Sequence, residues 1–305
     1  MSRLAYLNGQ LVPESTLSVP IYDAGFVQGV TVAEQMRTFG GKLFRLEEHL
    51  KRLQRSLDII RIPNIDLASL GVAAEELAAN NHQLLDSDDD LGLSLFVTPG
   101  SYPTFAPPGA HEATIGMHTY PIPFHLWSDK YERGERLVVS DVRQVPNSCW
   151  PLELKCRSRM HYYLADREAR EREPGARALL LDQEGFIAEA STASVILFRE
   201  AEGFLSPPRE KILPGVSVGV LEELAREKGI DLSHRDLTVE DVYASDEVIL
   251  CSTSPCVLPV VSLDSRPIGA GTAGSVLQQI LAAWNRLVGL DIVEQSCKFS
   301  RRGDV

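Results

Sequence analysis

A helical pattern that directly follows strand patterns is the feature that most constrains the fold of this chain. Residues 30–39 and 42–45 have the character of strands and are separated by Gly40-Gly41. Between residues 46 and 60 the apolar residues then recur at helical spacing, with charges between them: Leu50, Leu53, Leu57 and Ile60. A chain that alternates in this way is predicted to have a mixed α/β (α+β) fold.

The rest of the chain continues this mixture, and the chain as a whole divides into two domains joined by a linker. The Asn8-Gly9 turn and the turn at residues 182–185 predict hairpins. Further strands are predicted at residues 91–98, 114–121, 136–142 and 247–251, and further helices at 67–85, 159–172, 217–229 and, as the last helix, 274–289. An irregular stretch then predicts three parts: a small N-terminal α+β domain (1–122), a linker (123–134) and a large C-terminal domain (135–305).

Composition argues against several classes of protein. The 305 residues carry a formal net charge of −12, which would repel nucleic-acid phosphates and anionic membranes. No apolar run approaches the roughly 18 residues of a membrane-spanning helix, and the N-terminus lacks the apolar segment of a signal peptide. The five cysteines include no CxxC pair, which favours free thiols in a reducing cytoplasm. We interpret the acidic run at residues 86–90 as a solvated loop, with no metal site.

Lys155 is the lysine whose surroundings differ most from those of an ordinary surface residue. It lies in the apolar, strand-like segment 151–156, just before a predicted helix. A partly desolvated amine loses its proton more readily and becomes nucleophilic at neutral pH, as Schiff-base chemistry requires. The alternative is a lysine at a strand end that is paired with Glu153 or another carboxylate.

Two turns rich in small and hydroxyl residues could bind an anion. Residues 212–217 lead into a predicted helix, and the N–H groups at a helix start can bind a phosphate. Ser217 could equally be the N-cap of that helix. The Ser-Thr-Ser turn at residues 252–254 directly follows a strand, a position where ligands often bind in α/β proteins. Together, the two turns indicate an anion site.

Two charged residues could hold other parts of a flat ligand. Glu189 has small neighbours that leave room beside its carboxylate, and a carboxylate on a pyridine nitrogen would keep that nitrogen protonated. The alternative is an exposed glutamate next to a turn. Arg52 shares a helix face with His49 near the buried side, so we expect a fixed anionic partner, either a phosphate or Glu48. The sequence has no nucleotide, zinc-protease or serine-hydrolase motif.

The order of these segments resembles that of the class IV (fold-type IV) pyridoxal-phosphate aminotransferases. This family includes branched-chain aminotransferases, D-amino-acid aminotransferases and aminodeoxychorismate lyases. The resemblance extends from Leu7-Asn8-Gly9 to the last predicted helix, and its segments are residues 46–53, 154–155, 187–191, 213–217 and 252–254. It implies a two-domain enzyme that usually works as a homodimer, with a larger C-terminal domain that is pseudo-barrel-like and binds the cofactor.

The resemblance also implies a role for each matching residue. Lys155 would be the Schiff-base lysine and proton shuttle, and Glu189 would hold the pyridine N–H of pyridoxal 5'-phosphate. The phosphate of this cofactor would be bound by Arg52, Val216, Ser217 and Thr253. The substrate pocket would be lined by Ala33, Arg37 and Ser254.

The substrate side departs from the family pattern. Ala33 replaces an aromatic residue, Met160 stands where branched-chain enzymes have a tyrosine, and Val218 replaces an arginine. Pro99 stands where D-amino-acid enzymes tend to carry a carboxylate-binding arginine. We therefore expect a branched-chain-like aminotransferase that acts on an amino acid and a 2-oxo acid. The alternatives are a lyase of the aminodeoxychorismate type, which releases pyruvate, and a non-catalytic protein that binds pyridoxal phosphate.

Overall fold

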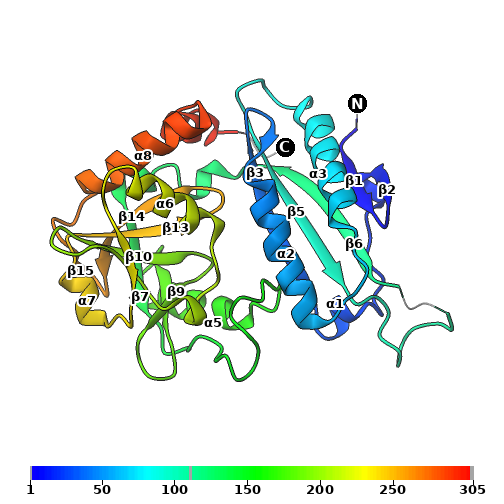
Figure 1. Ribbon diagram of the computed structural model, residues 1–305, viewed down its shortest axis with the longest axis horizontal. Helices are drawn as coiled ribbons and strands as arrows, with labels where there is room; N and C mark the ends of the chain where they lie inside the picture. The colour runs from blue at the N-terminus through cyan, green and yellow to red at the C-terminus, as the bar shows by residue number, and fades with distance from the viewer. Residues whose placement is uncertain (1, 110–111, 303–305) are drawn as a thin grey trace. The chain divides into compact units, whose positions relative to one another are not determined.

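The computed structural model of the protein describes residues 2–109 and 112–302, and the chain divides into two compact units (Figure 1). Unit 1 is formed by residues 1–122 and 154–158, and unit 2 by residues 123–153 and 159–305. The division after residue 122 falls at the start of the predicted linker. The segment that contains Lys155 differs from our expectation, because it folds with the N-terminal unit.

Unit 1 contains an antiparallel sheet in the order β2-β1-β6-β5-β3-β4. Its strands are β1 (Leu4–Leu7), β2 (Gln10–Pro13), β3 (Val32–Phe39), β4 (Lys42–Leu43), β5 (Leu91–Thr98) and β6 (Thr114–Pro121). Its helices are η1 (Glu14–Thr16), α1 (Ala24–Val27), α2 (Leu46–Ile60) and α3 (Leu67–His82). The first hairpin, α2, β5 and β6 confirm the predictions, whereas α3 ends at His82 instead of residue 85.

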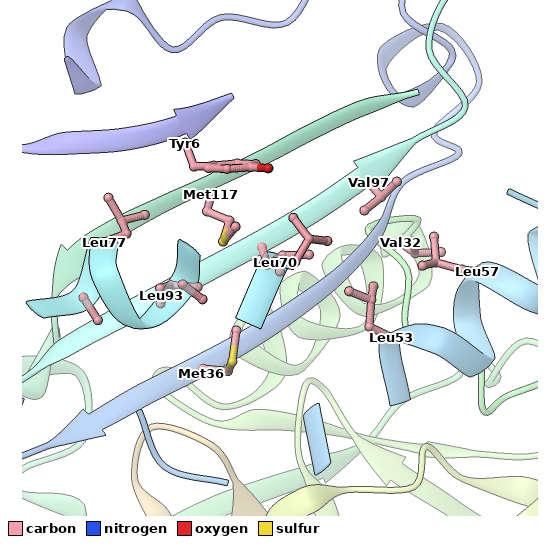
Figure 2. Close-up of a cluster of buried hydrophobic side chains, with 13 residues drawn as sticks. Tyr6, Val32, Met36, Leu53, Leu57, Leu70, Leu77, Leu93, Val97 and Met117 are labelled. Carbon is pink, nitrogen blue, oxygen red and sulfur yellow. The ribbon is translucent and has the colours of Figure 1, made fainter. Parts of the chain in front are cut away.

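Helices α2 and α3 pack against the sheet of unit 1 through their apolar sides (Figure 2). The buried cluster between them includes Val32, Met36, Leu53, Leu57 and Leu70. Burying one such side chain contributes about 1.5–3 kcal/mol. Because side chains alternate along a strand, the cluster also fixes the direction of the polar residues of β3. Glu34 must face the helices, and Ala33 must face the opposite side of the sheet.

The acidic run at residues 86–90 is only in part the solvated loop that we predicted, because residues 86–88 are exposed but Asp89 and Asp90 are buried. Asp90 accepts hydrogen bonds from the Thr38 hydroxyl (2.6 Å) and from the N–H groups of Gly40 (3.3 Å) and Gly41 (3.1 Å). The carboxylate therefore holds the turn between β3 and β4. Among the residues that the structure describes, no group of three or more His, Cys, Asp and Glu side chains could hold a metal ion.

Unit 2 contains a mixed sheet in the order β12-β11-β10-β13-β14-β7-β8-β9, with β15 paired to β14. The strands are β7 (Glu135–Val139), β8 (Arg177–Leu181), β9 (Ile187–Ala190), β10 (Ser194–Arg199), β11 (Gly203–Ser206), β12 (Leu232–His234), β13 (Glu247–Ser252), β14 (Cys256–Leu263) and β15 (Arg266–Pro267). Ala190 and Ala193 form a bridge, and β9 contacts β10 as well as β8. The sheet thus curves back on itself, as expected of a pseudo-barrel-like domain.

The helices of unit 2 differ from the prediction at both ends of the unit. They are η2 (Phe124–Leu126), α4 (Lys130–Arg133), α5 (Met160–Arg172), η3 (Arg209–Lys211), α6 (Val216–Arg226), α7 (Val239–Tyr243), α8 (Ser275–Val288) and α9 (Ile292–Phe299). The predicted linker contains η2 and α4. Helix α8 is not the last helix, because α9 follows it. The N-cap of α9 is Asp291, whose side chain accepts hydrogen bonds from the N–H groups of Val293 and Glu294. Within residues 2–109 and 112–302, no helix is long and apolar enough to cross a bilayer.

Candidate active site

Lys155 lies in an extended segment that adds to the edge of β3. The Ala33 N–H donates to the Lys155 carbonyl (2.9 Å), and the Arg157 N–H donates to the Thr31 carbonyl (2.8 Å). On its other side, the Lys155 N–H donates to the Ser56 hydroxyl of α2 (3.2 Å). The main chain at Lys155 is therefore fixed between a strand and a helix by bonds that do not depend on its side chain.

The pairing of this segment also sets the direction of the Lys155 side chain. Cys156 bridges Val32, and Leu154 packs against the apolar cluster beneath α2 and α3. Since alternate residues of an extended segment point to opposite faces, Lys155 and Arg157 point to the face that Ala33 occupies. Arg157 agrees with this placement, because its guanidinium donates to the Ser94 hydroxyl of β5 (2.6 Å).

Arg52 is held by a buried carboxylate on the facing strand. Its Nε donates to Glu34 Oε1 (2.8 Å) and its Nη2 to Glu34 Oε2 (2.7 Å), a bidentate arrangement. His49 Nδ1 also lies 2.7 Å from Glu34 Oε2. All three residues are buried. The suggestion that Glu48 is the partner was wrong, because Glu48 pairs with Arg45 (3.2 Å).

The electrostatics of this triad favour a charged Glu34 and a neutral His49. Burial alone would raise the pKa of Glu34, but the charge of Arg52 and the hydrogen bonds from Arg52 and His49 outweigh it. The pKa therefore falls from its usual 4.5 to about 2. Burial lowers the pKa of His49 against the opposing pull of Glu34, and the positive charges of Arg52 and Lys155 lower it further. The Lys155 amine is thus within electrostatic reach of the triad.

Acid should destabilise the protein through these two groups. Unfolded chains bind a proton at His49 below about pH 6.5 and at Glu34 below about pH 4.5, whereas the folded state binds them at lower pH. Stability therefore rises with pH in this range, and the Glu34 contribution, about 3 kcal/mol, should be lost between pH 4.5 and about 2. Urea unfolding between pH 7 and 3 measures it. Glu34→Gln should be less stable than the wild-type protein at pH 7 but should lose less stability below pH 4.5. If the unfolding free energies of the two proteins fell in parallel with pH, the prediction would be contradicted.

Glu189 of β9 is a buried carboxylate with several donors, not the exposed glutamate of the alternative interpretation. The Tyr162 hydroxyl (2.9 Å) and the Gln144 amide (3.2 Å) donate to its Oε2. The Leu213 N–H donates to its Oε1 (3.1 Å). Because Leu213 belongs to the loop before α6, the carboxylate is tied directly to the predicted anion-binding turn.

Helix α6 begins two residues earlier than it would if Ser217 were its N-cap. Gly215 is the N-cap, and Ser217 is the second residue of the helix, so the suggestion that Ser217 caps it was wrong. Gly215 has no side chain that could accept from the first N–H groups. An N-terminus without a side-chain cap leaves these donors for another acceptor, which suits an anion at Val216 and Ser217.

The turn that carries Thr253 and Ser254 joins β13 to β14, and α6 packs against β13. Ser252 and Cys256 form the closing pair of the hairpin. The Tyr131 hydroxyl of α4 donates to the Pro255 carbonyl at the tip (2.7 Å). A residue of the predicted linker therefore fixes the second turn that we predicted to bind an anion.

The predicted site residues thus fall into two groups. In unit 1 lie Lys155, Arg52, Ala33 and Arg37, and in unit 2 lie Glu189, Val216, Ser217, Thr253 and Ser254. Arg37 is buried, its Nε donates to the Thr38 carbonyl (3.2 Å), and its guanidinium lies 3.9 Å from Asp90. We missed Glu34, Gln144 and Tyr162. Of these, only Glu34 had a signal, because it directly follows Ala33, which the resemblance placed in the substrate pocket.

Comparison with known proteins identifies relatives over nearly the whole chain. Residues 31–263 match the family described as Amino-transferase class IV. A protein of Methanocaldococcus jannaschii, provisionally named a branched-chain-amino-acid aminotransferase, is 29% identical over 278 residues, or 90% of this chain and 93% of that protein. The D-alanine aminotransferase of Bacillus licheniformis is 27% identical over 279 residues, or 90% and 94%. The solved structure of a T.th. branched-chain amino acid aminotransferase with pyridoxamine 5'-phosphate has a TM-score of 0.82 and 25% identity, and 95% of each chain is covered.

Proposed function

Because this chain belongs to the class IV aminotransferases, we propose that it carries pyridoxal 5'-phosphate on Lys155 and moves an amino group from an amino acid to a 2-oxo acid. The placement of Lys155 supports this proposal most directly. Its main chain is fixed by Ala33 and Ser56. Its side chain points to the face of the sheet that α2 and α3 leave uncovered, where an amine can meet a ligand.

The other donors fit this cofactor by their chemistry. A buried carboxylate, Glu189, suits the protonated ring nitrogen. The uncapped start of α6, at Val216 and Ser217, suits the phosphate, and Thr253 adds a hydroxyl. Arg52 would add a positive charge whose orientation Glu34 fixes through two hydrogen bonds.

The reaction requires proton transfer at the substrate Cα. Lys155 would carry out this transfer, and Glu189 would support it from the ring nitrogen. When bound, the cofactor supplies an electron-poor ring that stabilises negative charge at this carbon. The Lys155 amine would take the proton from the substrate Cα and deliver it to the cofactor carbon on the other side of the amino nitrogen. Glu189 would keep the ring nitrogen protonated throughout, because its carboxylate is already stabilised as an anion by three donors.

For the substrate, we propose a branched-chain-like amino donor, with two molecules of the protein forming a homodimer in the cytoplasm. The relatives named above support this choice, since they include branched-chain aminotransferases of similar length. Ala33 and Ser254 would contact the substrate. Arg37 is less suited to that role than the sequence suggested, because it is buried and packs on Phe39, 3.9 Å from the ring centre.

Reduction and mapping test the proposal directly. Borohydride should fix the cofactor covalently to the peptide that contains Lys155, and mass spectrometry of a digest should locate it there. Candidate amino donors should then change the absorbance of the unreduced protein to that of the pyridoxamine form. Labelling of a different lysine, or a protein without the cofactor, would contradict the proposal. Pyruvate release without a 2-oxo acid acceptor would instead support the lyase alternative.

A further inference from the structure

We propose that Tyr162 and Gln144 are positioning residues that hold Glu189 charged and correctly oriented for the ring nitrogen of the cofactor. This inference rests on the proposed function and assigns the control of ring protonation to two residues outside the matched motifs. Both residues belong to unit 2, as Glu189 does. Tyr162 comes from the first turn of α5, and Gln144 from the segment that follows β7.

The side chains of Tyr162, Gln144 and Glu189 are joined to one another by hydrogen bonds. Gln144 Nε2 lies 3.2 Å both from Glu189 Oε2 and from the Tyr162 hydroxyl, and that hydroxyl lies 2.9 Å from Glu189 Oε2. Gln144 therefore donates to both partners, and Tyr162 accepts from Gln144 while it donates to Glu189. Two donors thus converge on one carboxylate oxygen.

The orientation of the Gln144 amide is fixed by its own neighbours. Its Oε1 accepts from the Val145 N–H (3.0 Å), so its NH₂ group must face Glu189. Its main chain is held on both sides: the Gln144 N–H donates to the Leu181 carbonyl (2.9 Å), and the Gln144 carbonyl accepts from Gln183 Nε2 (2.8 Å). A flipped amide would lose the bond to Val145 and would place an acceptor against the carboxylate.

Tyr162 is held in the same way and stays a donor. Its ring packs on His161, with centroids 4.0 Å apart. Burial raises the pKa of the Tyr162 hydroxyl well above its usual value, and the charge of Glu189 raises it further. The hydroxyl therefore keeps its proton at neutral pH and can donate a hydrogen bond to the Glu189 carboxylate.

The neutrality of these donors matters for the chemistry. Hydrogen bonds to the charged form stabilise the carboxylate as an anion. A lysine or arginine would do so too, but its positive charge would oppose a protonated pyridine nearby. Tyr162, Gln144 and the Leu213 N–H stabilise the anion and carry no charge themselves. Their arrangement is therefore suited to a carboxylate that must itself hold a cationic ring.

Removing the Tyr162 hydroxyl should weaken the binding of the cofactor and shift the pH at which its absorbance changes. In Tyr162→Phe, we expect the dissociation constant of the cofactor to rise about tenfold, as loss of one hydrogen bond to a charged group implies. The ring should be protonated less completely, which makes the nitrogen that links it to Lys155 more basic. The midpoint of the pH titration of cofactor absorbance should then move up by about one unit. Gln144→Leu, which removes the second donor to Glu189 Oε2 without adding a charge, should change both quantities in the same direction.

Tyr163→Phe is the matched control, because Tyr163 is the next residue of α5 and is 65% exposed. It should leave both the titration midpoint and the dissociation constant unchanged. If Tyr162→Phe lowers only the unfolding midpoint of the cofactor-free protein, the residue is structural and the inference is overturned. If the wild-type protein binds no cofactor at Lys155, the proposed function fails instead, so the two failures can be told apart.

Discussion

Lys155→Ala should abolish amino-group transfer, lowering kcat by a factor of about 10⁴ or more. Proton transfer by a positioned side chain alone is typically worth 10²–10⁴-fold, and the variant also loses the covalent attachment of the cofactor. The rate of appearance of the pyridoxamine form, with saturating amino donor and added cofactor, measures this effect. Lys51→Ala is the control, because Lys51 is exposed on α2, the helix that contacts the Lys155 segment.

The loss of activity should not reflect unfolding. The hydrogen bonds that fix residue 155 within unit 1 use its N–H and carbonyl, with Ser56 and Ala33 as partners, and alanine keeps both. The free energy of unfolding of the cofactor-free variant should therefore stay close to that of the wild-type protein. If the folded variant retains more than a few per cent of the wild-type rate, Lys155 is not the residue that carries out the proton transfer.

The elements that could be predicted from the sequence are those whose signal is local. Helix α2 has apolar residues at helical spacing, and β5 is an apolar strand that stops before Pro99-Gly100; the bounds predicted for both, and those for β6, are correct. Helix α9 was missed because we gave its start no N-cap, although Asp291 stands there. The predicted start of α6 failed for a related reason, since a glycine N-cap leaves no side-chain signal to distinguish it from Ser217.

The site shows the same limit at longer range. The position of Arg52 on its helix face predicted a buried anionic partner. That partner is Glu34 on strand β3, which is distant in sequence, and not the sequence neighbour Glu48. Asp90 looked like part of a charged loop because its donors, Thr38 and the next turn, are about 50 positions away in the chain. Tyr162 and Gln144 carry no local mark of their contact with Glu189. The residues that we propose to carry the chemistry could be named from the sequence, whereas the residues that hold them in place could not.

Glu34→Ala should destabilise the protein by about 3–5 kcal/mol, because it removes one partner of a buried ion pair. Arg52 is 5% exposed and donates two hydrogen bonds to Glu34, so the variant removes the carboxylate that balances a buried guanidinium. Chemical unfolding at pH 7 measures the loss. Glu48→Ala is the control: Glu48 is 43% exposed and pairs with Arg45, and such a pair is worth roughly 0–1 kcal/mol.

A double variant separates the structural role of the pair from its proposed role at the phosphate. Glu34→Leu with Arg52→Met replaces both charges by apolar side chains of similar volume, and such replacements are often neutral or stabilising. We expect it to regain most of the stability that Glu34→Ala loses. Its affinity for the cofactor should nevertheless fall, because the positive charge is gone, whereas its affinity for pyridoxal without phosphate should not change. If the double variant binds the phosphorylated cofactor as tightly as the wild-type protein, Arg52 serves the fold alone, and the phosphate depends on α6 and Thr253.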